Sequence, residues 1–120
     1  MVENINNLDP FEIVETVKAD KSSRVVLEGR IDHQLPDGNT KTGNLQIEFQ
    51  NSCVSVTEKT FDQYLQSFFE IEINPEDLVQ VIHKDISEVL GLDADSLDLY
   101  VQIQYKSSHT SKTVTKGQLA

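Results

Sequence analysis

The chain of 120 residues has no tryptophan, one methionine and a single cysteine. Because Cys53 has no second cysteine to pair with, an intrachain disulfide and a zinc cluster built from several cysteines of this chain are excluded. No apolar run approaches the roughly 18 residues of a membrane-spanning helix. The N-terminus lacks the basic start and apolar segment of a secretory signal. These absences predict a cytoplasmic protein without a membrane partner.

Positive charge is also scarce, since 10 Lys and Arg stand against 20 Asp and Glu, for a formal net charge of -10. The basic residues are scattered and form no stripe along the sequence. A field of this sign repels a phosphate backbone, so we expect no direct nucleic-acid binding. Hydrophobic residues make up 38% of the chain, which is enough for the core of one domain.

The two ends of the chain are polar, which places the expected domain at residues 23–117. Residues 1–22 are expected to be a tail or a short helix, because Asp9 can cap a helix and Pro10 suits its first turn. The alternative for segment 12–17 is a short strand. Residues 118–120 are expected to be a tail.

Three segments, 24–32, 44–50 and 97–105, alternate apolar and polar residues as half-buried strands do. Turn-forming residues at 35–43 predict a hairpin with a long loop between the first two. Val54 and Val56 are expected to extend the second strand past a bulge, and residues 113–115 predict a short fourth strand. The apolar positions of one face are Val25, Leu27, Gly29, Ile31, Leu45, Ile47, Phe49, Leu97, Leu99, Val101, Ile103 and Tyr105.

Two helices are predicted between the second and third strands. The first has one continuous apolar face, made by Phe61, Tyr64, Leu65, Phe68 and Phe69.

The second predicted helix has Asn74-Pro75-Glu76-Asp77 as its start signal and Gly91 as its stop. Its expected buried stripe is Leu78, Val79, Ile82, Ile86, Val89 and Leu90.

The order strand, strand, helix, helix, strand, strand predicts an α+β domain. We expect a four-stranded antiparallel sheet (ββααββ) with two helices on one face. The outer strands of such a sheet have unpaired edges that invite another chain. We therefore expect a homo-oligomer that joins sheets edge to edge, with the helices outside.

The histidines offer one site candidate and no metal site. No two of them have the i, i+4 spacing of a helical zinc pair. His83 lies beside the apolar stripe of the second helix, where a packing or surface role is expected. His33 stands at the mouth of the long loop and is the better candidate.

The stretch V-T-E-K-T-F-D-Q-Y-L-Q-S-F, with N-P-E-D-L-V shortly after it, resembles the 7-cyano-7-deazaguanine nitrile reductases of queuosine biosynthesis. Their signature is roughly E-S-K-S-x-K-x-Y-L-x-S-F-R, followed by a helix that starts F-H-E-D-x-V. The resemblance covers about residues 24–105, and its specific part is about 25 residues long. It implies the tunnelling fold (T-fold), a barrel formed by oligomerisation, and a purine- or pterin-like ligand at a subunit boundary.

The catalytic residues of that family have no counterpart here. The family's nucleophilic cysteine precedes a proline in the hairpin loop, where this chain has Gln34-Leu35-Pro36. The covalent thioimide needs a thiolate, and neither residue before the proline supplies one. The nearby acid falls on or near Lys41, and Cys53 lies at the far end of the second strand. The resemblance therefore implies a divergent member without nitrile reductase activity and without a catalytic residue.

The cofactor side departs from the family as well. Asp62 replaces the second signature lysine, and Phe69 replaces the arginine after S-F. Basic groups are what would hold the extra phosphate of NADPH. NADPH is therefore disfavoured, and no other cofactor is indicated.

The resemblance implies a ligand-binding set of Glu76, Glu58, Lys59 and His33. Glu76 coincides with the glutamate that accepts hydrogen bonds from the ligand's ring N–H and amino groups in the T-fold. Its alternative role is to stabilise the first turn of a helix. The alternative function is a non-catalytic structural or protein-interaction domain that forms a homo-oligomer.

Overall fold

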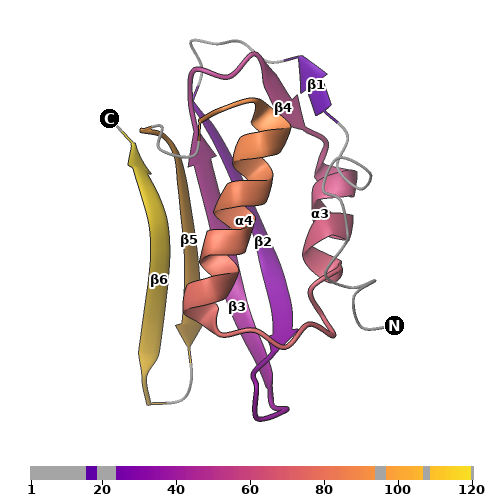
Figure 1. Ribbon diagram of the computed structural model, residues 1–120, viewed down its shortest axis with the longest axis vertical. Coiled ribbons are helices and arrows are strands. Elements are labelled where there is room, and N and C mark those ends of the chain that lie inside the picture. The colour runs from indigo at the N-terminus through magenta and orange to yellow at the C-terminus, as the bar shows by residue number, and fades with distance from the viewer. Residues whose placement is uncertain (1–15, 19–23, 94–96, 107–108, 120) are drawn as a thin grey trace.

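The computed structural model describes residues 16–18, 24–93, 97–106 and 109–119. In chain order the elements are β1 (Thr16–Lys18), β2 (Val25–Gln34), β3 (Thr40–Phe49), β4 (Val54–Val56), α3 (Glu58–Gln66), α4 (Pro75–Leu90), β5 (Asp98–Lys106) and β6 (Ser111–Leu119) (Figure 1). The expected helix start at Asp9 lies outside the described residues. Thr16 and Val17 lie in a strand, which agrees with the strand alternative for segment 12–17.

The main sheet has four antiparallel strands in the order β2-β3-β5-β6. Helix α4 crosses the front of this sheet, and α3 stands beside it near β2 (Figure 1). The predicted α+β class, with antiparallel strands and two helices, is confirmed. The helices come between β3 and β5, which are neighbours in the sheet, so two hairpins pair along their inner strands.

The core lies between α4 and the covered face of the sheet. Leu78, Ile82 and Ile86 of α4 are completely buried, and each buried side chain of this size contributes about 1.5–3 kcal/mol. Gly91 ends the helix with a positive φ of 71°, as predicted. The predicted apolar stripe of α4 is confirmed, since Leu78, Val79, Ile82, Ile86, Val89 and Leu90 are all buried.

Strand β4 does not extend β3, contrary to expectation. It pairs instead with β1 in a separate two-stranded sheet. Asn51 takes a left-handed conformation with φ 60°. The Ser52 hydroxyl donates to the Val54 carbonyl oxygen at 2.8 Å and accepts from the Val54 N–H at 3.2 Å. These contacts fix a turn that takes the chain out of the main sheet.

The apolar face of α3 ends one residue earlier than predicted. Phe68 is 5% exposed and packs edge-to-face on Tyr64, with ring centroids 5.2 Å apart. Phe69 is 53% exposed because the helix stops at Gln66 and the following residues turn. Leu97 is also exposed rather than buried, since β5 begins at Asp98.

Strand β6 has nine residues rather than the three predicted, and it ends at Leu119, two residues beyond the expected domain. The hairpin loop is short, because β2 ends at Gln34 and β3 begins at Thr40. The Leu35 N–H donates to the Asn39 carbonyl oxygen at 2.8 Å and closes this loop. Neither helix in the described part of the chain is long and apolar enough to cross a bilayer.

Candidate functional site

The site lies where the β2–β3 hairpin meets the start of α4. The Gln34 N–H donates to the Ile71 carbonyl oxygen at 3.0 Å, and the Ile73 N–H donates to the Gln34 carbonyl oxygen at 2.8 Å. These two bonds form a parallel bridge between Gln34 and Glu72. Because the bridge is backbone to backbone, it fixes the entry to α4 against the end of β2.

The first turn of α4 presents Glu76. The Asn74 carbonyl oxygen accepts hydrogen bonds from the Asp77 and Leu78 N–H groups at 3.0 and 2.9 Å. Pro75 occupies the first helical position, where it costs no hydrogen bond. The Asn74 side chain makes no capping bond. The predicted start of α4 is confirmed, and the cap rests on the backbone rather than on the Asn74 side chain.

His33 and Tyr105 form a buried pair beneath this turn. The His33 Nε2 atom lies 2.8 Å from the Tyr105 hydroxyl oxygen, and the rings meet edge to face. His33 is fully buried. This burial, with a smaller contribution from the charge of Lys41, lowers its pKa against the raising effects of the Gln34 and Ile73 backbone and of Asp32. Burial, followed by the charge of Glu76, raises the pKa of Tyr105. Both groups are therefore neutral at pH 7.

Two lysines stand beside this pair. The Lys41 Nζ atom lies 5.4 Å from the centroid of the Tyr105 ring, a cation–π distance. The Lys112 Nζ atom lies 2.5 Å from the Glu76 Oε2 atom, with the side chains 51% and 60% exposed. The hydrogen bond from Lys112 is the main reason why the pKa of Glu76 is lowered. The carboxylate is thus ionised, accessible and already paired.

The structure brings together two of the four residues expected to bind a ligand. His33 is hydrogen-bonded to Tyr105, and the charge of Glu76 helps to raise the pKa of Tyr105, so both residues lie close to this side chain. His33 is the penultimate residue of β2 rather than part of a loop, and its side chain points into the core. Glu58 and Lys59 are exposed in the first turn of α3. That turn lies near β4, at the opposite end of the helical layer from the start of α4 (Figure 1).

Sequence reasoning missed three members of this cluster: Lys41, Tyr105 and Lys112. Tyr105 and Lys112 are direct partners in the β5–β6 register, but the register of two strands is not visible in a single sequence. One signal was available for Tyr105. It is the one residue with a polar tip on the buried face of 97–105, and a buried tyrosine hydroxyl usually has a partner.

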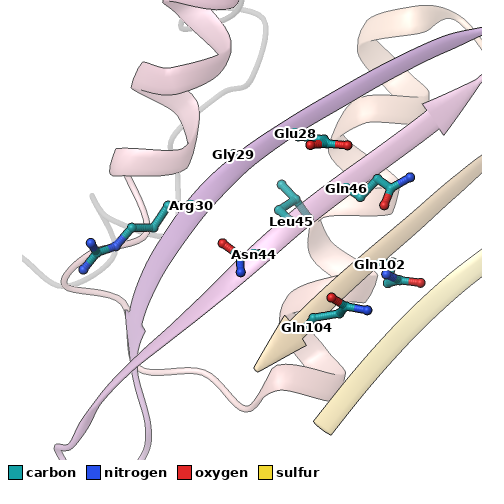
Figure 2. Close-up of a pocket in the computed structure, with 8 residues that line it drawn as sticks. All are labelled: Glu28, Gly29, Arg30, Asn44, Leu45, Gln46, Gln102 and Gln104. Carbon is teal, nitrogen blue, oxygen red and sulfur yellow. The ribbon is translucent and has the colours of Figure 1, made fainter. Parts of the chain in front are cut away.

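The uncovered face of the sheet carries a polar hollow of about 450 Å³. Figure 2 shows side chains from β2, β3 and β5 around it. One carboxylate, one guanidinium and four carboxamides contribute, so the lining is close to neutral. The lining residues are Glu28, Gly29, Arg30, Asn44, Leu45, Gln46, Gln102 and Gln104.

A second hollow of about 300 Å³ lies beside the end of α3, next to Arg30 and Phe69. Glu76 lines neither of these two hollows.

No cysteine thiol lies in this region. Leu35 and Pro36 close the hairpin, while Cys53 is exposed beyond the other end of β3. Across the described ranges, no group of three or more His, Cys, Asp or Glu side chains is placed to hold a metal ion. The cluster of His33, Tyr105, Lys41, Glu76 and Lys112 can exchange hydrogen bonds and charge with a ligand, and it contains no cysteine thiol.

No protein-family model matches this chain, and no curated protein matches it. Among solved structures it is similar to the archaeosine synthase QueF-Like in its apo form, with a TM-score of 0.72 and 14% sequence identity. The likeness covers 84% of this chain and 98% of that chain. At this identity the comparison shows a shared QueF-like fold.

Proposed function

We propose, from this shared fold, that the chain is a divergent relative of the 7-cyano-7-deazaguanine reductases that binds a purine- or pterin-like heterocycle without reducing a nitrile. The observation that carries the proposal is Glu76. Its carboxylate is ionised and accessible in the first turn of α4, next to the His33–Tyr105 pair. The hydrogen-bonded pair holds the floor of this site in one geometry.

A carboxylate suits the edge of such a heterocycle. Its two oxygens accept two parallel hydrogen bonds, one from a ring N–H and one from an exocyclic amino group. The pKa of Glu76 is lowered by Lys112, so both oxygens act as acceptors at neutral pH. A protonated acid would lose one of these acceptor positions.

The residues around the hairpin support the proposal that the chain does not reduce a nitrile. Gln34 has no thiol, and its backbone is committed to Ile71 and Ile73. Leu35 cannot attack a nitrile, and Cys53 lies beyond the far end of β3. Asp62 and Phe69, at the positions of two basic signature residues, are both exposed. A cofactor that relies on cations there, NADPH above all, is disfavoured.

We also propose that the binding site is completed by a second copy of the chain. Apart from the bridge at Gln34, the outer edge of β2 has no partner strand among the described residues, and neither has the outer edge of β6. Joining these edges between copies would close the sheets into a barrel and remove the free edges. Glu76 would then face a subunit boundary, together with Glu58 and Lys59 of one copy or the other.

Calorimetric titration tests the ligand proposal. Solutions of 7-deazaguanine, guanine and pterin are titrated into wild-type protein, Glu76→Gln and the matched control Asp77→Asn. Both residues are exposed acids in the first turn of α4, so both variants weaken the interaction with the helix dipole alike. We expect binding to wild type and to Asp77→Asn and its loss in Glu76→Gln. Absence of heat with wild type rejects binding of these heterocycles, and equal heat with Glu76→Gln rejects Glu76 as their anchor.

The alternative function is a structural or protein-interaction domain that oligomerises through the same edges. The ion pair between Lys112 and Glu76 favours this reading, because it satisfies the carboxylate within the protomer. Light scattering combined with the calorimetric titrations separates the two. A stable oligomer that binds none of the three heterocycles supports the structural role, whereas a Glu76-dependent heat of binding excludes a purely structural role.

A further inference from the structure

The carboxylate proposed to anchor the heterocycle is engaged by Lys112, which lies 2.5 Å away at the start of β6. A ring N–H that approaches the Glu76 Oε2 atom must compete with this ammonium group. When it succeeds, Lys112 is left next to the ligand without its anion. A bare heterocycle has no anionic group to replace the carboxylate beside Lys112. The cost of breaking the ion pair therefore reduces its net binding free energy.

Lys41 supplies a second ammonium group to the same place. Its Nζ atom lies over the Tyr105 ring, and Tyr105 is the cross-strand partner of Lys112. Within the described ranges, Lys41 forms no ion pair. In a chain with twice as many acids as bases, an ammonium group without a carboxylate partner is available for an anion from outside.

The charges of the cluster do not cancel. Lys41 and Lys112 give two positive charges, whereas Glu76 gives one negative charge, and the pair His33–Tyr105 is neutral. The N-terminus of the 16-residue helix α4 adds positive potential at the same point. Of the nearby carboxylates, Asp32 is already paired with Arg30, and Glu72 and Asp77 are exposed and form no ion pair within the described residues. Among the groups that contact Tyr105 or Glu76, a neutral heterocycle therefore leaves the ammonium group of Lys41 without an anion.

Resting on the proposed function, we infer that the ligand is a heterocycle that carries a phosphate, such as a nucleoside monophosphate, with its ring on Glu76 and its phosphate on Lys112 and Lys41. Lys112 then pairs with the phosphate in place of the Glu76 carboxylate. Lys41 gains an anion it lacks in the free protein. Lys112 thus has two opposite effects: it competes with the base and it holds the phosphate.

Lys112→Gln should therefore change the affinities for a nucleoside and for its monophosphate in opposite directions. Guanosine and guanosine 5′-monophosphate, which differ by the phosphate alone, are titrated into wild type, Lys112→Gln, Lys41→Gln and the control Lys84→Gln. Lys84 is an exposed lysine of α4. The variants are checked for folding by circular dichroism, and titrations are made at low and high salt.

Wild type is expected to bind the monophosphate more tightly than guanosine, with a difference that shrinks at high salt. Lys112→Gln should bind guanosine more tightly, by up to about fivefold as for the loss of an exposed ion pair, and should bind the monophosphate more weakly. Lys41→Gln should weaken the monophosphate alone. Lys84→Gln should behave as wild type.

The inference is overturned if the phosphate adds no affinity, if its contribution is the same in all three lysine variants, or if Lys112→Gln shifts both ligands in the same direction. In these cases Glu76-dependent binding of guanosine still upholds the proposed function. If wild type binds neither ligand nor any of the bare heterocycles, the proposed function and this inference fail together.

Discussion

The hydroxyl of Tyr105 and the Nε2 atom of His33 are 2.8 Å apart, although 72 positions separate the two residues in the chain. The bond joins the end of β5 to the end of β2 across β3. Both side chains are almost completely buried, so water cannot replace either partner. The bond therefore holds the floor of the candidate site and contributes to stability at the same time.

Tyr105→Phe should lower the free energy of unfolding by about 1–3 kcal/mol, because it leaves a buried histidine nitrogen without a partner. Urea denaturation measures the change. Tyr100→Phe is the matched control, since the Tyr100 hydroxyl donates to Gln102 on the polar face of the sheet and water can replace that bond. Equal losses in the two variants would show that the His33–Tyr105 bond contributes no more to stability than the bond between Tyr100 and Gln102.

Gly117→Ala should destabilise the fold more than Gly38→Ala. Both glycines have a positive φ, 84° and 89°, so both variants incur the same backbone strain of about 1–2 kcal/mol. A Cβ atom at Gly117 would lie 2.3 Å from the Leu99 carbonyl oxygen, whereas nothing lies within 4 Å at Gly38. Denaturant midpoints of the two variants should therefore differ, and coinciding midpoints would contradict this close packing.

The fold should lose stability as the pH falls below about 6.5. Burial lowers the pKa of His33 and of His83 from the ordinary value of 6.5, and Lys116 lowers the pKa of His83 further, against a raising contribution from the Leu99 backbone. A histidine with a lowered pKa stabilises the folded state above the pKa of the unfolded chain, and this contribution disappears in acid. Urea unfolding between pH 7.5 and pH 5 measures the slope.

His83→Leu should reduce this pH dependence and raise stability by about 1 kcal/mol at pH 7, because the buried Nε2 atom of His83 has no hydrogen-bond partner among the described residues. A variant that is less stable than wild type at neutral pH, with an unchanged slope, would show that the imidazole is needed for packing. The sequence left a packing role and a surface role open for His83, and its 2% exposure places it in the packed interior.

Ile82→Ala should cost about 2–5 kcal/mol, since it opens a cavity at a completely buried position of α4. The adjacent Val81 is 38% exposed, so Val81→Ala should change stability by less than about 1 kcal/mol. Thermal or urea unfolding of the pair compares two neighbouring branched residues on one helix. Similar losses would mean that α4 is not packed on the sheet as described.

The elements that could be predicted from the sequence are those that bury one face and leave the other exposed. In β3 and β5 alternate residues reach a single core, so the apolar positions Leu45, Ile47, Leu99 and Val101 reveal the strands directly. Strand β6 was underestimated because it is an edge strand. Val114 is its one buried residue in the described part, and an edge strand needs few apolar side chains to be held by backbone bonds.

Other errors came from backbone conformations that a pattern does not reveal. The positive φ of Asn51 and the turn at Ser52 redirect the chain, so Val54 and Val56 pair with β1 instead of extending β3. Phe69 kept the helical spacing in sequence, but α3 had already ended.

The candidate site was predictable where a local signal existed. The start motif of α4 placed Glu76 correctly in the first turn. Lys112 reaches Glu76, and Lys41 reaches the Tyr105 ring, only through the pairing of strands in the sheet, which a single sequence does not show. The proposed roles of Glu58 and Lys59 depend on a second copy of the chain and stay predictions.

The bridge at Gln34 connects the β2–β3 hairpin directly to the segment that leads into α4. Its backbone bonds to Ile71 and Ile73 fasten the short hairpin loop to the entry of α4, so a displacement of the first turn of α4 by a ligand at Glu76 would also move the loop. A fluorescent or spin probe attached at the exposed loop residue Asp37 would therefore sense occupancy at Glu76 without touching the ligand.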